Sequence, residues 1–579
     1  MTHTFRVWAP IAHRMAVDID GRRLDMSARE DGWWEATVDG AGPGTRYAFS
    51  VDGGPARPDP RSSSQPEGVD GWSEIVDHGS FSWRDSGWRG LPLPGSVLYE
   101  LHVGTFTDPG TFDAVVERLP HLVDLGADAI ELLPVAEFAG TRGWGYDSVD
   151  LFAPHHRYGG PEGLKRLVDA CHEHGLGVIM DVVYNHLGPS GNYLADFGPY
   201  FTDRHHTDWG AAVNFDGSDS REVRRFVIDN ALMWLRDYHC DGLRIDAVHA
   251  IVDQSPIHIL EELSTEVEAL ACDLHRHLFL IAESDLNEPR LVRSRDGGGF
   301  GLDAAWADDW HHALHARFTG ERNGYYSDFG SLSALAKALQ QAWVYDGQWS
   351  EYRRRTRGRP PMGLDGSRFV VSLQNHDQIG NRAKGERLGH LIPAARLKVA
   401  AALLLAGPFT PMLFQGEEWG ATSPFQYFAD MDDPDLRRAV RDGRRREFAG
   451  FGWNPEHIPD PGDPATFERS KLDWSEPRRP LHAEILKWYR QLIRLRHDLP
   501  GMSDPRPERH RVAWDEDAGW VMAQRGQYLV AASLGADTVV LTVPRGTRTV
   551  TVSNPTVHLG DGRLVLPPDS VAIMSTAQL

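Results

Sequence analysis

Apolar segments typical of strands alternate with amphipathic segments typical of helices through the middle of this chain. Such alternation predicts a parallel sheet whose strands are joined by crossover helices. Helices are predicted at residues 111–125, 161–174, 221–239 and 257–276, with a closing helix at 482–497. Eight strands are predicted, at residues 97–103, 127–133, 177–183, 243–248, 278–282, 302–307, 369–373 and 411–414.

Acidic residues follow three of these predicted strands. Asp246, Glu283 and Asp377 each come after a run rich in Ile, Leu and Val. A single Asp at a strand end is more often a helix cap or a surface charge. Three of them, each with an Arg or His close by, predict a site that cuts a sugar, at the strand ends where a (β/α)8 barrel keeps its catalytic residues. The count of eight strands and the recurring acids favour this α/β fold, a closed (β/α)8 TIM barrel, over an open sheet.

Short strand-like runs flank the predicted barrel. Residues 1–92 predict an N-terminal immunoglobulin-like or carbohydrate-binding-like β-sandwich, and residues 501–579 predict a C-terminal β-sandwich. The barrel would then occupy residues 93–500. Two segments within it, 187–220 and 417–479, are too long for plain connections, and we interpret the first as an excursion over the active face.

Charge and composition exclude several kinds of partner. The chain has 579 residues, and its formal net charge of −22 argues against nucleic acid or an anionic membrane as partner, whereas a neutral substrate would be unaffected. The start of the chain lacks the pattern of a signal peptide and no stretch is long enough for a membrane span, so a cytoplasmic protein is expected. Cys171, Cys240 and Cys272 are widely spaced and odd in number, which predicts reduced, buried thiols.

The three carboxylates suit the breaking of a glycosidic bond. This reaction needs an acid that protonates the leaving oxygen and a second carboxylate that meets the oxocarbenium-like carbon. Asp246 is the predicted nucleophile, because Arg244 lies two residues earlier on the same strand face and would keep Asp246 ionised. Glu283 is the predicted general acid and base, because its apolar neighbours would raise its pKa. Asp377, preceded by His376, would hold sugar hydroxyls, and the scheme requires no metal or cofactor.

Histidine pairs raise the alternative of metal catalysis. His205 is followed by His206, and His311 by His312. Sequence neighbours point apart on a strand or a helix, which disfavours a shared ion. His186, which follows Asn185 at a strand end, is interpreted as part of a sugar-binding corner, although such a pair is often only structural.

Four segments together resemble a known family. Residues 181–186 (DVVYNH), 242–249 (GLRIDAVH), 281–285 (IAESD) and 374–377 (QNHD) are similar, in order and spacing, to the four signature regions of the α-amylase superfamily, glycoside hydrolase family 13. The resemblance implies that Asp246 is the nucleophile, Glu283 the acid/base and Asp377 the transition-state stabiliser of a retaining glycosidase.

The same resemblance implies a set of substrate-binding residues. Arg244, His186 and His376 match the family residues that hold the sugar in subsite −1. Tyr146, in GWGYD, matches the aromatic residue on which that sugar stacks, and His249 would face subsites +1 and +2.

Further segments are similar to one group within this family, which hydrolyses malto-oligosyltrehalose beside its terminal trehalose in trehalose biosynthesis. The resemblance implies this substrate, no cofactor, and a place after malto-oligosyltrehalose synthase. Two positions depart from the pattern, since Trp310 and Gln415 stand where Phe and Met are expected. Asp308, Trp310 and Glu417 are candidates for recognising the trehalose end, with surface polar groups or a core Trp as the alternative. The segments are residues 5–10, 59–62, 99–107, 281–287, 308–312 and 413–420.

Three other functions stay open. A glycogen branching enzyme shares the expected architecture, but its fourth region usually reads HDE, whereas this chain has Gln378 after Asp377. A general α-amylase would use the same catalytic residues. A non-catalytic carbohydrate-binding scaffold on this fold would have lost catalytic carboxylates, and all three remain here. Analysis of the products formed from a trehalose-capped oligosaccharide separates these functions.

Overall fold

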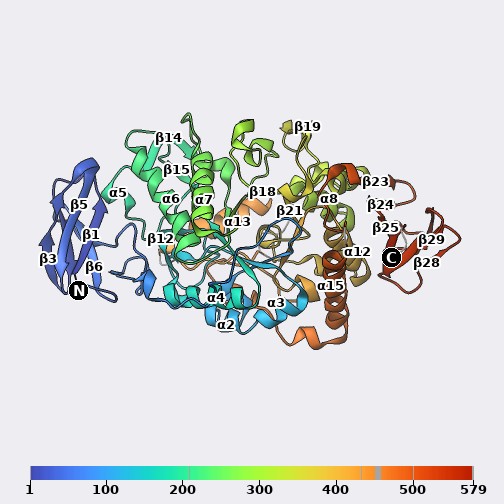
Figure 1. Cartoon of the computed structure of the whole chain (residues 1–579), viewed down its shortest axis with the longest axis horizontal. Coiled ribbons are helices and arrows are strands. Elements are labelled where there is room, and N and C mark those ends of the chain that lie inside the picture. Colours follow the sequence, from blue (N-terminus) through green and yellow to red (C-terminus); the bar gives the residue numbers. More distant parts are fainter. Residues whose placement is uncertain (1, 208, 432, 450–457, 500, 577–579) are drawn as a thin grey trace.

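A computed structural model of the chain describes residues 2–207, 209–431, 433–449, 458–499 and 501–576. Figure 1 shows a small all-β region at the N-terminal end, a central barrel surrounded by helices, and a second all-β region at the C-terminal end. No helix among the described residues is both long and apolar enough to cross a membrane.

Eight parallel strands close into a barrel, which confirms the predicted (β/α)8 fold. Each strand overlaps a predicted one, and the last strand pairs with the first. The barrel order is β9 (Leu98–Leu101), β10 (Ala129–Leu132), β13 (Gly177–Val182), β16 (Gly242–Ile245), β17 (Phe279–Ala282), β18 (Ala304–Trp306), β21 (Phe369–Ser372) and β22 (Thr410–Phe414).

Strand pairing places polar side chains above an apolar layer inside the barrel. Ile179 belongs to a buried apolar cluster contributed by the barrel strands. Asp181 lies two residues further along β13, so it shares the face of Ile179. Asp181 is in register with Arg244 on β16, so the two side chains lie side by side. Charged groups are therefore gathered at the carboxyl ends of the strands.

Four of the five predicted helices are present, the fifth is divided in two, and the helices at residues 308–319, 332–341 and 394–405 were not predicted. The helix predicted at residues 111–125 is wrong, because two helices, α2 (Phe112–Val116) and α3 (Leu119–Leu125), occupy this range. Pro120 lies in the first turn of α3, and its missing N–H prevents one continuous helix. The other long helices outside the two excursions are α4 (Gly160–Glu173), α6 (Ser220–Arg236), α7 (Ile259–Leu274), α8 (Asp308–Thr319), α9 (Leu332–Gln341), α12 (Ala394–Leu405) and α15 (Pro480–Asp498).

The two predicted excursions contain elements that the sequence pattern did not reveal. The first holds a short helix, α5 (Leu194–Phe197), and a hairpin of β14 (Phe201–Thr207) and β15 (Gly210–Val213). The second holds α13 (Pro434–Ala449) and α14 (Pro464–Arg469); residues 450–457 of this excursion lie outside the described part.

Each end of the chain forms two antiparallel sheets, as predicted. The N-terminal sheets have the orders β1-β5-β4 and β3-β2-β6-β7, and the C-terminal sheets β23-β24-β25-β30-β27 and β26-β29-β28. Cys171 and Cys240 are buried as expected, whereas Cys272 on α7 is exposed, and all three are free thiols. The N-terminal strands are β1 (Thr2–Trp8), β2 (Met15–Ile19), β3 (Arg22–Asp25), β4 (Ser27–Ala28), β5 (Trp33–Asp39), β6 (Arg46–Val51) and β7 (Ala56–Arg57). The C-terminal strands are β23 (His510–Asp515), β24 (Trp520–Arg525), β25 (Tyr528–Ser533), β26 (Val539–Thr542), β27 (Arg548–Val552), β28 (His558–Gly560), β29 (Arg563–Leu566) and β30 (Ser570–Ser575).

Candidate active site

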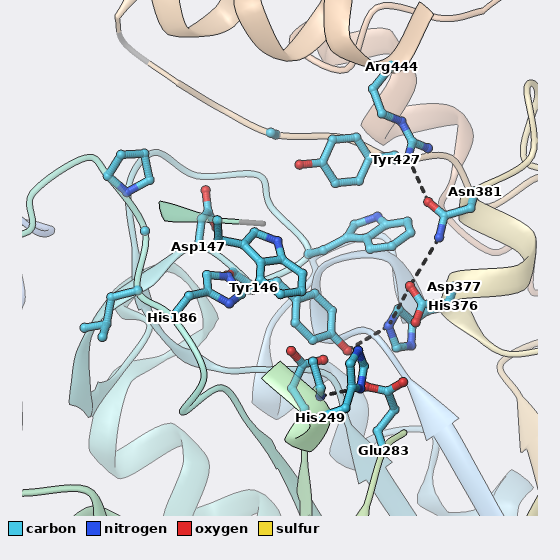
Figure 2. Close-up of a pocket in the computed structure, with 18 of the residues that line it drawn as sticks. Tyr146, Asp147, His186, His249, Glu283, His376, Asp377, Asn381, Tyr427 and Arg444 are labelled. Atoms are coloured by element: carbon cyan, nitrogen blue, oxygen red, sulfur yellow. Dashed lines mark hydrogen bonds and ion pairs between the residues drawn. The ribbon is translucent and has the colours of Figure 1, made fainter. Parts of the chain in front are cut away.

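A cavity of about 800 Å³ opens where the barrel strands end (Figure 2). Most of the residues singled out from the sequence line this cavity, although they come from strands far apart in the chain. They are Tyr146, His186, Asp246, His249, Glu283, Asp308, His376 and Asp377. Arg244 lies directly behind Asp246 and is fully buried.

Asp246 has a hydrogen-bond donor on each carboxylate oxygen. Arg244 Nη1 donates to Oδ1 at 2.7 Å, and Asn185 Nδ2 donates to Oδ2 at 2.8 Å. Arg244 Nη1 also contacts both oxygens of Asp181, each at 2.9 Å. Because a donor on each oxygen leaves the carboxylate little freedom to rotate, Asp246 is held in one orientation.

Glu283 lies beside the same arginine. Burial raises the pKa of Glu283 well above its usual value; Arg244, with Nη2 3.8 Å from Oε2, opposes this rise, and the Asp246 charge adds to it. The backbone N–H of Ala247 donates to Glu283 Oε2 at 2.6 Å. Ala247 has a φ of 39°, a value that residues with a Cβ rarely adopt, and this strained turn aims its N–H at the carboxyl group. Glu283 is therefore set up to carry a proton.

A hydrogen-bonded chain supports the floor of the cavity. His376 Nδ1 donates to Glu100 Oε1 at 2.5 Å, and Nε2 lies 2.7 Å from the Tyr146 hydroxyl. That hydroxyl donates to Asp181 Oδ2 at 2.6 Å. Burial lowers the pKa of His376, but Asp377 and Glu100 outweigh burial and raise it to about 9. His376 is therefore an imidazolium, which can donate from both ring nitrogens.

Asp377 is the most open of the three catalytic candidates. Its side chain is 44% exposed, facing the cavity. Two side-chain nitrogens lie near Oδ1: Asn381 Nδ2 at 3.4 Å and His376 Nε2 at 3.6 Å. A carboxylate with such long contacts keeps lone pairs available for sugar hydroxyls.

Further polar and aromatic residues line the cavity. His249 is exposed, and Asp308 is partly buried. Burial and then the charges of Asp285 and Asp377 raise the pKa of Asp308 to about 7. Trp209, at the tip of the β14–β15 hairpin, stacks on His186 with ring centroids 4.8 Å apart. The first excursion therefore contributes directly to the wall of the cavity, as expected.

Two predicted candidates for trehalose recognition lie away from the cavity lining. Trp310 is 1% exposed and belongs to the apolar core around the barrel. Glu417 is also 1% exposed, and it accepts a hydrogen bond from the Tyr489 hydroxyl at 3.1 Å. Burial raises the pKa of Glu417 to about 8. Both side chains support the core, because their backbone positions direct them behind the strand ends.

Several residues of the site were missed by sequence reasoning. Glu100 could have been found, because an acidic residue inside an otherwise apolar strand indicates an internal partner. Asn381, Tyr427 and Arg444 line the cavity, the last two from the second excursion. No local pattern marks Tyr427 and Arg444, since their place depends on how that excursion folds back.

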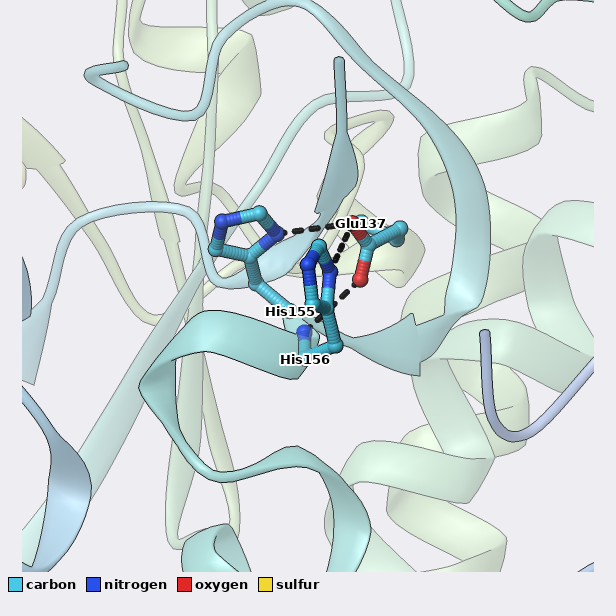
Figure 3. Close-up of side chains that lie close together, drawn as sticks. All are labelled: Glu137, His155 and His156. Carbon is cyan, nitrogen blue, oxygen red and sulfur yellow. Dashed lines mark hydrogen bonds and ion pairs between the residues drawn. The ribbon is translucent and has the colours of Figure 1, made fainter. Parts of the chain in front are cut away.

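A separate cluster offers the ligand atoms that a metal ion would need. Among the described residues, Glu137, His155 and His156 form the group with three such atoms within 4.8 Å of one another (Figure 3). Nδ1 of each histidine lies 2.8 Å from Glu137 Oε1, and the His156 backbone N–H donates to Oε2 at 2.8 Å. These adjacent histidines converge because they lie at the start of a 3-10 turn. Protein donors already satisfy the carboxylate, so the cluster acts as a hydrogen-bonded clamp between two strands beside the barrel.

Two family models match consecutive parts of the chain, the N-terminal sheets and the first part of the barrel. Residues 1–66 match carbohydrate-binding module 48, the isoamylase N-terminal domain. Residues 70–218 match the catalytic domain of alpha amylase.

Individual proteins are similar over nearly the whole chain. A malto-oligosyltrehalose trehalohydrolase from Arthrobacter ramosus is 52% identical over 92% of this chain and 93% of that protein. The enzyme of the same name from Mycobacterium tuberculosis is 46% identical over 99% of both chains. A crystal structure from Salmonella typhimurium, described as an alpha amylase, superposes with a TM-score of 0.91 at 39% identity, covering 99% of this chain and 98% of that one.

Proposed function

The chain belongs to the malto-oligosyltrehalose trehalohydrolase family, and we propose that it hydrolyses the α-1,4-glucosidic bond next to the terminal trehalose of malto-oligosyltrehalose and releases trehalose. One observation carries the proposal: Asp246, Glu283 and Asp377 meet in one cavity, in a chain whose relatives at 52% and 46% identity bear this name. The reaction is that of a retaining glycosidase.

Asp246 acts as the nucleophile in this proposal. Its two donors, Arg244 and Asn185, fix the carboxylate plane, so that one oxygen can attack the anomeric carbon of the glucose in subsite −1. The attack forms a covalent glycosyl-enzyme intermediate as the bond to trehalose breaks. Tyr146 provides the surface on which this glucose stacks, with His186 beside it.

Glu283 serves first as acid and then as base. Its raised pKa favours the protonated carboxyl group, which can donate its proton to the leaving oxygen of trehalose. Formation of the covalent intermediate removes the negative charge of Asp246, one of the causes of the raised pKa. The pKa of Glu283 then falls, and the carboxylate can take a proton from the attacking water.

Asp377 and His376 stabilise the transition state. As the ring of the −1 glucose flattens, the Asp377 carboxylate and the His376 imidazolium bind its hydroxyls more strongly than in the ground state. Interactions that strengthen only in the transition state raise kcat rather than tighten substrate binding.

His249 and Asp308 bind the trehalose end. Trehalose has no reducing end, and its 1,1-linkage turns the last glucose away from the path of a maltose unit. A carboxyl group with a pKa of about 7 can both donate to and accept from hydroxyls near neutral pH, which suits Asp308 to this role.

The surroundings of the reaction follow from its chemistry. Hydrolysis does not make the 1,1-linkage, so a malto-oligosyltrehalose synthase must act first, in the same cytoplasmic trehalose biosynthesis.

The chain is divided into an N-terminal sandwich (1–92), a catalytic barrel (93–500) and a C-terminal sandwich (501–579). A branching function has less support, because the GlgB branching enzyme of Pseudoalteromonas atlantica is 28% identical over 73% of this chain and 61% of that protein.

Product analysis with two substrates of equal length tests the function. The value of kcat/KM should be about 10-fold to 10⁴-fold higher for maltotriosyltrehalose than for maltopentaose, since a polar site built for specific hydroxyls discriminates on this scale. Free trehalose should be released, with little transfer. Equal rates on the two substrates would indicate a general amylase, and new α-1,6 linkages in amylose would indicate a branching enzyme.

A further inference from the structure

The helix that carries His376 and Asp377 is only five residues long. This helix, α10 (His376–Gly380), begins with a capping box in which the Asn375 side chain accepts from the backbone N–H groups of Asp377 and Gln378. A single turn of helix has little stability of its own. The position of Asp377 therefore depends on the groups that bind both ends of α10.

Arg444 of α13 binds the other end of this helix. Its Nη2 donates to the Gly380 carbonyl oxygen at 2.7 Å, and its Nη1 donates to Asn381 Oδ1 at 2.7 Å. The guanidinium lies 4.6 Å from the centroid of the Tyr427 ring. In Figure 2 the Arg444 side chain reaches from its helix toward Asn381, on the side of the cavity that holds Asp377. A cation at the carbonyl end of a helix is favourable, so this contact stabilises α10.

Asn381 connects Arg444 to the catalytic carboxylate. The Asn381 backbone N–H donates to the Asp377 carbonyl oxygen at 2.8 Å, and its Nδ2 lies 3.4 Å from Asp377 Oδ1. His376 Nε2 is the other nitrogen near Oδ1, but it is already bonded to the Tyr146 hydroxyl. Asn381 is therefore the better placed of the two to orient the carboxylate of Asp377.

The direction of the Asn381 amide is fixed by its two neighbours. A guanidinium only donates hydrogen bonds and an ionised carboxylate only accepts them. Arg444 must therefore face the amide oxygen, which leaves the NH₂ group facing Asp377. Without Arg444 the amide could rotate by half a turn and present its oxygen to Asp377, which would repel the carboxylate.

We propose that Arg444 is a positioning residue for the hydrolysis: it fixes the Asn381 amide and thereby orients the Asp377 carboxylate. The inference rests on the proposed role of Asp377 in the transition state. It gives the second excursion a part in catalysis, because α13 supplies the group that orders the end of a barrel strand. The contact of 3.4 Å is long, as catalytic hydrogen bonds often are before substrate binds.

Two other roles for Arg444 make different predictions. If Arg444 contacts the sugar chain directly, its replacement would chiefly raise KM, because such binding is equal in the ground and transition states. If Arg444 only anchors α13, its replacement would lower thermal stability, and the effect would not depend on Asp377. If Arg444 is a positioning residue, its replacement lowers kcat, and only while the Asp377 carboxylate is present.

Kinetics of single and double variants on maltotriosyltrehalose test the inference. Arg444→Gln and Asn381→Ala should each lower kcat by about 10- to 100-fold, the scale of a misplaced catalytic group, with KM changed by less than about 3-fold. The double variant should be no slower than the slower single variant, since both act on one path. Arg441→Gln is the matched control, because Arg441 lies on the same helix, pairs with Asp442, and is not in the cavity lining; it should retain wild-type kinetics.

A cycle with Asp377→Ala decides the mechanism. In single-turnover reactions, adding Arg444→Gln to Asp377→Ala should change the rate by less than about 2-fold, because no carboxylate is left to orient. An equal loss in both backgrounds, or an equal loss in the Arg441→Gln control, would overturn the inference. Wild-type kcat for Arg444→Gln together with an inactive Asp377→Ala would refute the inference alone. Wild-type activity of Asp377→Ala would instead refute the proposed role of Asp377.

Discussion

Replacing Asp246 by Asn removes the proposed nucleophile while keeping its shape. The carboxylate now accepts one hydrogen bond from Arg244 and one from Asn185. An amide keeps one acceptor and turns its NH₂ group toward the other donor. One buried donor is thus left without a partner, at a cost of about 1–3 kcal/mol in stability. The barrel should still fold, because the remaining contacts of Arg244 with Asp181 are untouched.

The loss of activity should far exceed the loss of stability. Removing an essential nucleophile should lower kcat/KM on maltotriosyltrehalose at least about 10³-fold, which corresponds to about 4 kcal/mol of transition-state stabilisation. The pKa of Glu283 should fall as well, because the negative charge of Asp246 is one of the causes that raise it. The alkaline limb of any residual activity should therefore move to lower pH.

Trehalose release followed by chromatography, together with thermal unfolding of both proteins, provides the measurement. A folded Asp246→Asn variant that keeps more than a tenth of the wild-type rate would refute the assignment of the nucleophile. An unchanged alkaline limb in a variant with residual activity would refute the electrostatic coupling between Asp246 and Glu283. A variant that is inactive but also unfolded would be replaced by Asp246→Ser, which removes the same charge with a smaller side chain.

Three further outcomes are expected. If Asp246 and Glu283 act as proposed, their carboxyl groups should lie roughly 5–5.5 Å apart and the new reducing end should appear first as the α-anomer in early proton NMR spectra; an initial β-anomer would mean inversion. Glu100→Gln should lower the pKa of His376 from about 9. That raised pKa stabilises the folded wild type below pH 6.5, and the stabilisation disappears as the pH rises from 6.5 to about 9. The Tm of the wild type should therefore fall over this window more than the Tm of the variant, and parallel curves of Tm against pH would contradict the pairing. Asp308→Asn should lower kcat/KM for maltotriosyltrehalose by about 10-fold or more and for maltopentaose much less, and equal losses would remove Asp308 from the trehalose end.

The barrel and the strand-end carboxylates could be predicted because their signals are local. An apolar run that ends in an acidic residue marks both a strand and the face to which its last side chain points. Arg244 and Asp246 illustrate this, since a spacing of two residues places their side chains on the same side where β16 ends, and the structure joins them at 2.7 Å. Once eight such strands close into a barrel, their carboxyl ends must meet.

The rest of the site could not be read from local patterns. Arg444 and Tyr427 reach the cavity only because the excursion after β22 folds back over it. Trp310, by contrast, is close to a cavity residue in the sequence but does not reach the cavity. It lies two residues after Asp308, yet the turns of α8 carry Asp308 to the cavity and Trp310 into the core. Nearness in sequence to a cavity residue is therefore a weak guide on a helix, where the direction of a side chain changes with every residue.

The same buried charges hold the barrel strands in register and build the site. Two cations, Arg244 and His376, face three acidic residues, Glu100, Asp181 and Asp246, inside the barrel. The Arg244–Asp246 pair follows from spacing along one strand, but the Arg244–Asp181 pair depends on the register between β13 and β16. Removing one partner of a buried pair leaves an uncompensated charge, at a cost of about 3–5 kcal/mol. The arrangement that orients Asp246 therefore also fixes the register of the strands, and a shift of one residue between β13 and β16 would break the pair and lose the site together with the fold.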